Sequence, residues 1–204
     1  MPSWFWDQLS SNLSLLNISF DRIRGELPNP LKVPAFADVS MKSNLFEGPL
    51  PNLSNGVELL DLSGNRFSGS IPPNIGKVSP YLIFLSLSGN SLSGLIPSSS
   101  IGEMQSLQVL DLSNNNLIGP IPTNLYNCSF LKALDLGHNN LNGPIPSSIG
   151  SLEPASDASL TAQQNSPKPS LARFETGNNR PRIEHLIGRN SDLGRGEAKA
   201  GCAY

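Results

Sequence analysis

Side chains suited to acid–base or nucleophilic chemistry are few in this sequence. It contains two histidines, His138 and His185, and two cysteines, Cys128 and Cys202, which lie 74 residues apart. Neither histidine has a matching nucleophile, and the spacing of these four residues fits no metal site. We therefore expect no catalytic residue, no metal, no cofactor and no enzymatic activity. Cys128 is expected to be a free, buried thiol.

Three carboxylates recur at one position of a repeated motif. Asp61, Asp111 and Asp135 each stand between two leucines in the sequence Leu-Asp-Leu. Because side chains alternate along an extended strand, the leucines would point one way and the aspartates the other. The repetition of the motif favours scaffold residues that face solvent over a carboxylate cluster.

The aspartates belong to a repeat of 21 to 25 residues. Its clearest copy is LQVLDLSNNNLIGPIP at 107–122, with close copies at 57–72, 82–97 and 131–146 and looser ones at 13–28 and 36–51. The asparagine position of the motif holds, in order, Asp21, Asn44, Asn65, Asn90, Asn115 and Asn139. This period and consensus are typical of a leucine-rich repeat. We predict an α/β repeat solenoid dominated by β-structure, a right-handed superhelix with a parallel sheet on its concave face.

One coil of such a solenoid cannot bury its leucines alone, so stacked coils must share a continuous core. The amide of each motif asparagine can tie neighbouring coils together, because it carries two donors and one acceptor. Asp21 can only accept hydrogen bonds when ionised, so the bonds between coils should be weaker at the N-terminal end of the stack. Ile71, Ile96, Ile121 and Ile145 are expected to point inward. Short helical turns should follow Pro73 and Ser147, whereas Pro28–Pro34 should be extended.

The repeats and the remainder of the chain differ in composition. Residues 1–152 read as about six uncapped repeats, with Trp4, Phe5 and Trp6 packed under the first coil, and we expect an internal fragment of a longer array. From Pro154 the sequence becomes polar, which predicts a disordered tail over 153–204. We interpret this tail as a non-homologous end from a truncated or mis-spliced gene; the alternative is a basic regulatory tail. The net charge of −2 argues against a nucleic-acid partner. There is no secretory signal and no apolar run long enough for a membrane span.

The phrases LDLSGN, LDLSNN and LYNCSFLKALDLGHN, together with the Gly-x-Ile-Pro ending, resemble the plant-specific class of leucine-rich repeats. The sequence is similar to the ectodomains of plant leucine-rich-repeat receptor-like proteins, including those that perceive fungal elicitors. That resemblance implies a glycoprotein on the extracellular face of the plasma membrane, which binds a peptide or protein ligand and signals through partner receptor kinases in defence or development. Two alternatives are an inhibitor of a secreted microbial enzyme, like the plant polygalacturonase inhibitors, and a non-functional truncated product.

Stacked strands turn each outward position into a column across the concave face. Leu59, Phe84 and Val109 would form an exposed apolar strip, which either marks a binding site, with Phe84 as its largest contact, or is ordinary strand surface, where singly exposed apolar residues are common. The candidate ligand-binding residues are Glu58, Leu59, Ile83, Phe84, Gln108, Val109, Lys132 and His138.

Four sequons are present. Asn12, Asn17, Asn52 and Asn127 could carry glycans if the chain is secreted, and a glycan on Asn17 would obstruct the concave face of the first coil.

Overall fold

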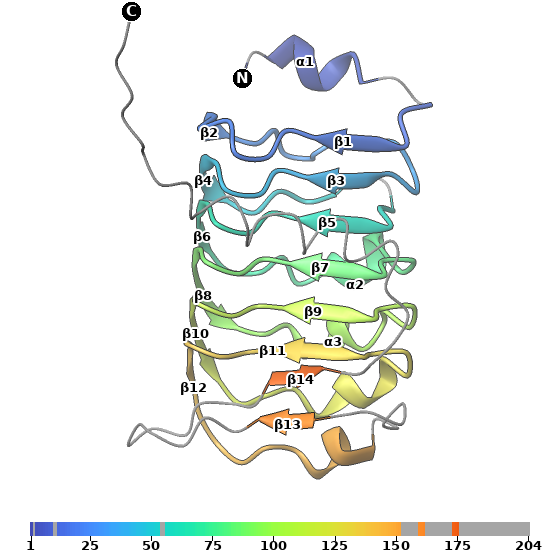
Figure 1. The fold of residues 1–204 in the computed structure, drawn as a ribbon, viewed down its shortest axis with the longest axis vertical. Helices are drawn as coiled ribbons and strands as arrows, with labels where there is room; N and C mark the ends of the chain where they lie inside the picture. Colours follow the sequence, from blue (N-terminus) through green and yellow to red (C-terminus); the bar gives the residue numbers. More distant parts are fainter. Residues whose placement is uncertain (2, 10–11, 54–55, 152–158, 162–172, 176–204) are drawn as a thin grey trace, which may run out of the picture.

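In the computed structural model, residues 1, 3–9, 12–53, 56–151, 159–161 and 173–175 are described. Two parallel sheets run along a stack of coils (Figure 1). The concave sheet takes one strand from each repeat: β1 (Leu15–Asn17), β3 (Asp38–Ser40), β5 (Leu59–Asp61), β7 (Phe84–Ser86), β9 (Val109–Asp111) and β11 (Ala133–Asp135). These are the six repeats expected from the sequence, and the predicted fold class is confirmed.

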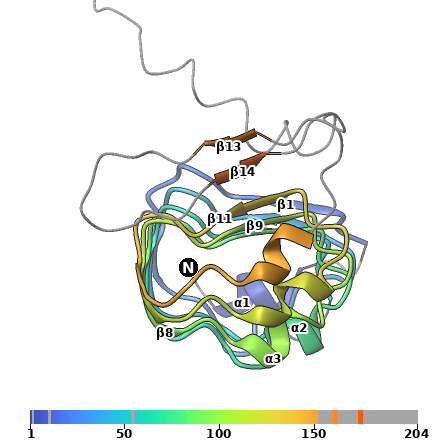
Figure 2. The same cartoon turned by 90° about the horizontal axis from the view of Figure 1, so that it is seen from below.

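A second sheet forms where the chain leaves each motif asparagine. Its strands are β2 (Arg24–Glu26), β4 (Leu45–Pro49), β6 (Arg66–Gly69), β8 (Ser91–Leu95), β10 (Asn116–Gly119) and β12 (Asn140–Leu141). The third side of each later coil is a short turn of helix: α2 (Ile75–Val78), α3 (Ser98–Ile101), η1 (Thr123–Asn127) and η2 (Ser147–Ser151). Seen along the stack, the two sheets and the helical turns enclose the core (Figure 2).

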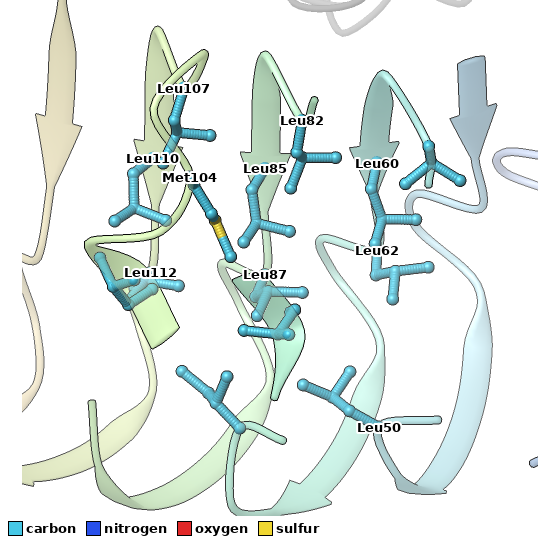
Figure 3. Packing of buried hydrophobic residues seen from close by; sticks show 14 of the residues in the cluster. Leu50, Leu60, Leu62, Leu82, Leu85, Leu87, Met104, Leu107, Leu110 and Leu112 are labelled. Carbon is cyan, nitrogen blue, oxygen red and sulfur yellow. The ribbon is translucent and has the colours of Figure 1, made fainter. Parts of the chain in front are cut away.

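The core is a continuous column of leucines. Leu60, Leu85 and Leu110 come from successive concave strands and are at most 2% exposed. They pack with Leu62, Leu87 and Leu112 from two positions later, and Met104 fills the space behind them (Figure 3). Burying one such side chain contributes about 1.5–3 kcal/mol. The period-two alternation read from the sequence therefore sets the inward face.

The motif asparagines form the expected ladder between coils. Asn65 is typical: its Nδ2 donates to the carbonyls of Met41 in the preceding coil and Leu62 in its own, both at 3.0 Å. Its Oδ1 accepts the backbone N–H of Phe46 at 3.1 Å. At the first coil Asp21 is exposed, and its own N–H donates to the Oδ1 of Asn44.

The ends of the stack differ from expectation in detail. Residues Ser3–Asp7 form α1, where Trp6 joins the core and Phe5 packs against it, but Trp4 is 59% exposed and does not pack under the coil. At the other end β14 (Arg173–Glu175) pairs antiparallel with β11, and β13 (Ser159–Thr161) pairs with β14. The remaining residues of 153–204, for which disorder is expected, lie outside the described part of the chain.

Two residues leave the positions that the repeat assigns to them. Phe36 aligns with the buried Leu107, yet it is 59% exposed, and the fully buried Ala37 takes its place. Ile145 is 56% exposed instead of inward, whereas Ile71, Ile96 and Ile121 are buried as expected. The described residues include no helix long and apolar enough to cross a membrane.

Candidate functional site

The concave sheet brings the candidate ligand-binding residues together in the predicted register. Leu59 pairs with Phe84, Phe84 with Val109, and Val109 with Ala133 on neighbouring parallel strands. Their inward neighbours belong to the core cluster, whereas Leu59 and Phe84 lie outside it. The assignment of this column to the outward face is therefore confirmed.

The expected exposure of that column is wrong in its centre. Leu59 and Phe84 are each only 3% exposed, while Val109 is half-buried. A repeat pattern sets the direction of a side chain but not what lies over the sheet. Phe84 is therefore not an exposed apolar contact, whereas Val109 and Ala133 in the same column are half-buried.

The preceding column runs Glu58, Ile83, Gln108 and Lys132, and all four residues are half-buried. Backbone hydrogen bonds of 2.8 Å join each to the next. The Nζ of Lys132 donates to the Oε1 of Gln108 at 3.0 Å. Lys132 and Gln108 thus present an ammonium and an amide as one polar pair beside Val109.

The column before the motif asparagine is a left-handed corner in every coil. The residues are Phe20, Ser43, Gly64, Gly89, Asn114 and His138, with φ between 52° and 67°. Glycine meets no steric penalty there, and asparagine and histidine are the side chains that most often tolerate it. Asn114 and His138 are exposed on adjacent coils, so this corner displays two polar side chains next to β9 and β11.

The repeated aspartates are structural, but not all face solvent as expected. Asp61 is 4% exposed, and its Oδ1 accepts the N–H and the hydroxyl of Ser63 at 3.0 and 2.5 Å. Asp111 accepts the same two bonds from Ser113 and is half-buried. Burial raises the pKa of Asp61, and the bonds from Ser63 oppose that rise. These carboxylates hold the strand ends in shape.

Nothing in the described part of the chain assembles into a metal cluster. Cys128 is free and fully buried, as expected, and its Sγ donates to the Ile101 carbonyl at 3.3 Å. Burial raises its pKa to about 11, so the thiol stays protonated and unreactive. His185 and Cys202 lie outside the described residues.

The four sequon asparagines, Asn12, Asn17, Asn52 and Asn127, are all exposed. Asn17 lies in β1 on the concave sheet, where its Oδ1 accepts the N–H of Ser19 at 3.1 Å. Asn127 ends η1 on the opposite side.

An aromatic pair at the edge of the concave sheet was missed by the sequence analysis. Phe36 and Tyr81 are 59% and 58% exposed, with ring centroids 5.6 Å apart. They come from coils two repeats apart and meet beside Gly56, whose carbonyl accepts the N–H of Phe36 at 2.9 Å. Phe36 has a φ of 60°, a local conformation that the repeat pattern does not predict.

Known proteins similar to this chain are plant receptors. The Leucine Rich Repeat family model matches residues 56–78, 81–101, 106–128 and 130–152. Receptor-like protein 14 of Arabidopsis thaliana is 37% identical over 78 residues, which cover 37% of this chain and 8% of the relative. The chain thus spans less than a tenth of the length of that protein.

Solved structures agree with the sequence relatives. The ectodomain of the Arabidopsis receptor kinase GASSHO1/SCHENGEN3, in complex with CASPARIAN STRIP INTEGRITY FACTOR 2, is 39% identical with a TM-score of 0.63, covering 70% of this chain and 18% of that one. The Arabidopsis receptor kinase HAESA, in complex with the peptide hormone IDA and the co-receptor SERK1, is 31% identical with a TM-score of 0.56, covering 69% and 28%.

Proposed function

Because this chain is a leucine-rich-repeat protein similar to the ectodomains of plant receptors, we propose that it is a peptide- or protein-binding module of a plant cell-surface receptor-like protein. The observation that supports this most directly is the regular concave sheet, which carries the polar side chains of Gln108, Asn114, Lys132 and His138 at its β9–β11 end. The described residues include no group of three or more His, Cys, Asp or Glu side chains that could hold a metal ion.

The ligand surface that we propose lies over β9 and β11. Val109 supplies apolar contact, Gln108 and Lys132 supply an amide and an ammonium, and Asn114 and His138 flank them at the left-handed corner. Ile83 and Glu58 extend it toward the middle of the stack. Leu59 and Phe84 are buried and stay outside it.

The chemistry of these side chains suits an extended peptide. An asparagine or glutamine amide carries both donors and an acceptor, which match the C=O and N–H of a peptide unit. Lys132 adds a positive charge for a carboxylate of the ligand. Two of the similar solved ectodomains hold CASPARIAN STRIP INTEGRITY FACTOR 2 and the peptide hormone IDA, the second together with the co-receptor SERK1.

By the same similarity we propose a place on the extracellular face of the plasma membrane, partner receptor kinases for signalling, and a role in defence or development. In that setting Asn12, Asn17, Asn52 and Asn127 would carry glycans. A glycan on Asn17 would cover β1 and leave the surface over β9 and β11 open, since β3, β5 and β7 lie between.

The test uses a random peptide library displayed on phage and selected against the folded chain. Selected peptides should bind the wild-type chain, and His138→Ala and Gln108→Ala should each weaken that binding by about tenfold, or 1.4 kcal/mol. The matched control is Leu95→Ala, an exposed residue of β8 on the second sheet. If peptides bind but only Leu95→Ala weakens them, the concave surface is not the binding site.

A further inference from the structure

In the sixth coil the strand of the second sheet ends before Asn142-Gly143. In the three preceding coils the equivalent glycine lies inside a strand of the second sheet: Gly69 in β6, Gly94 in β8 and Gly119 in β10. β12 ends at Leu141, so Gly143 lies beyond it. The residues from Asn142 to Ile145 are all exposed. Gly143 keeps the positive φ of the equivalent glycines, 80° against 77–80°, but it lies outside the strand.

The loss of one core contact accompanies this early end of the strand. Ile121 is 4% exposed and anchors the corresponding segment of the fifth coil, whereas Ile145 is 56% exposed. The N–H of Asn142 donates to the Gly119 carbonyl at 2.9 Å, but the N–H of Gly143 has no partner among the described residues. The backbone nitrogen of Gly143, which can attack an asparagine side chain, therefore lies unbonded beside the exposed amide of Asn142.

We propose that Asn142 is a site of spontaneous deamidation. The backbone nitrogen of Gly143 attacks Cγ of Asn142, so that an N–Cγ bond forms and the Cγ–Nδ2 bond breaks. Ammonia leaves with the proton from the Gly143 N–H, and a cyclic succinimide remains. Water then opens the ring at either carbonyl and leaves aspartate or isoaspartate. Glycine favours the attack because no Cβ hinders the approach to its nitrogen.

The residue that precedes the motif glycine differs between the coils. The residue before the glycine is Ser68, Ser93 and Ile118 in the third, fourth and fifth coils. Among the glycines at this motif position, only Gly143 follows an asparagine. The reaction adds a negative charge, and its isoaspartate product adds a backbone carbon at the bend that leads to η2. This inference is independent of peptide binding.

The experiment incubates the full-length chain at mildly alkaline pH and follows each asparagine by peptide mapping with mass spectrometry. Asn142 should lose its amide at a rate within about tenfold of that in an unfolded synthetic peptide of the same sequence, a barrier difference below about 1.4 kcal/mol. Isoaspartate should accumulate in the same fragment. Asn142→Ser, which installs the residue of the third and fourth coils, should abolish both signals.

A matched variant separates local structure from sequence. Ser93→Asn places the same dipeptide in β8, where Ser93 is exposed and Gly94 is part of the sheet. It should deamidate at least about tenfold more slowly than Asn142, because the strand holds the attacking nitrogen in place. Equal rates at the two positions would overturn the inference. So would an Asn142 that keeps its amide while the synthetic peptide loses its own.

Discussion

The backbone N–H of Gly76 in α2 donates to the Oγ of Ser100 in α3 at 2.7 Å. Both residues are buried, and a Cβ built on Gly76 would overlap the backbone carbonyl of Ser100. Neighbouring coils can approach this closely on the helical side only because position 76 has no side chain.

Replacing Gly76 by alanine should therefore separate α2 from α3. We expect Gly76→Ala to lower the free energy of unfolding by about 1–3 kcal/mol, as overpacking does in other cores. Urea denaturation monitored by circular dichroism measures the change. Gly56→Ala is the matched control, because its Cβ would have no neighbour closer than 3.8 Å. That variant should be neutral or slightly stabilising, and an equal loss in both would contradict the argument.

Asn115 tests the ladder between coils. Its Nδ2 donates to the carbonyls of Leu87 and Leu112 at 2.9 and 3.1 Å, and its Oδ1 accepts the N–H of Leu92 at 3.0 Å. Asn115→Ala should cost about 3 kcal/mol of unfolding free energy, because it leaves buried backbone groups without partners. Asn116→Ala, at the exposed next residue, should change stability by less than about 0.5 kcal/mol. Similar melting temperatures for the two variants would show that the ladder adds little.

Asp61 should make stability depend on pH. Burial raises its pKa above the ordinary 3.8, so the folded chain binds this proton more tightly than the unfolded chain. The resulting stabilisation is fully present below the unfolded pKa and is lost as pH rises through the folded pKa. Asp61→Asn keeps an acceptor for Ser63 and removes the desolvated charge. In thermal melts, the melting temperature of Asp61→Asn should rise relative to that of the wild type as pH increases from about 3 to 7. A difference in melting temperature that does not change with pH would contradict the assignment.

Cys128 should be unreactive while the chain is folded. Its thiol is fully buried, and the pKa of about 11 keeps it protonated at neutral pH. In a Cys202→Ser background, a thiol reagent such as DTNB should label the folded chain only after denaturant is added. Labelling of the native chain at the rate of the unfolded one would show that the coil around Cys128 opens.

The sequence by itself determined the stack of coils. Its period sets how many residues each coil has, and the alternation within Leu-x-Leu decides that Leu110 and Leu112 point inward. The side-chain amides of Asn65 and Asn115 can both donate and accept, so they can join neighbouring coils by hydrogen bonds. These features follow from local geometry, because each repeat meets only copies of itself, and for the same reason the columns of the concave sheet could be read in order.

Tertiary structure alone decided which of those outward residues a ligand can reach. Phe84 and Val109 occupy the same column, yet Phe84 is buried and Val109 is half-exposed. Phe36 is exposed at a position that the repeat assigns to a buried leucine, and it contacts Tyr81 two coils away. Ile145 stayed outside the core although Ile121, at the same place in the motif, is buried. A side chain's direction is a property of its own strand, but its exposure is a property of the whole fold.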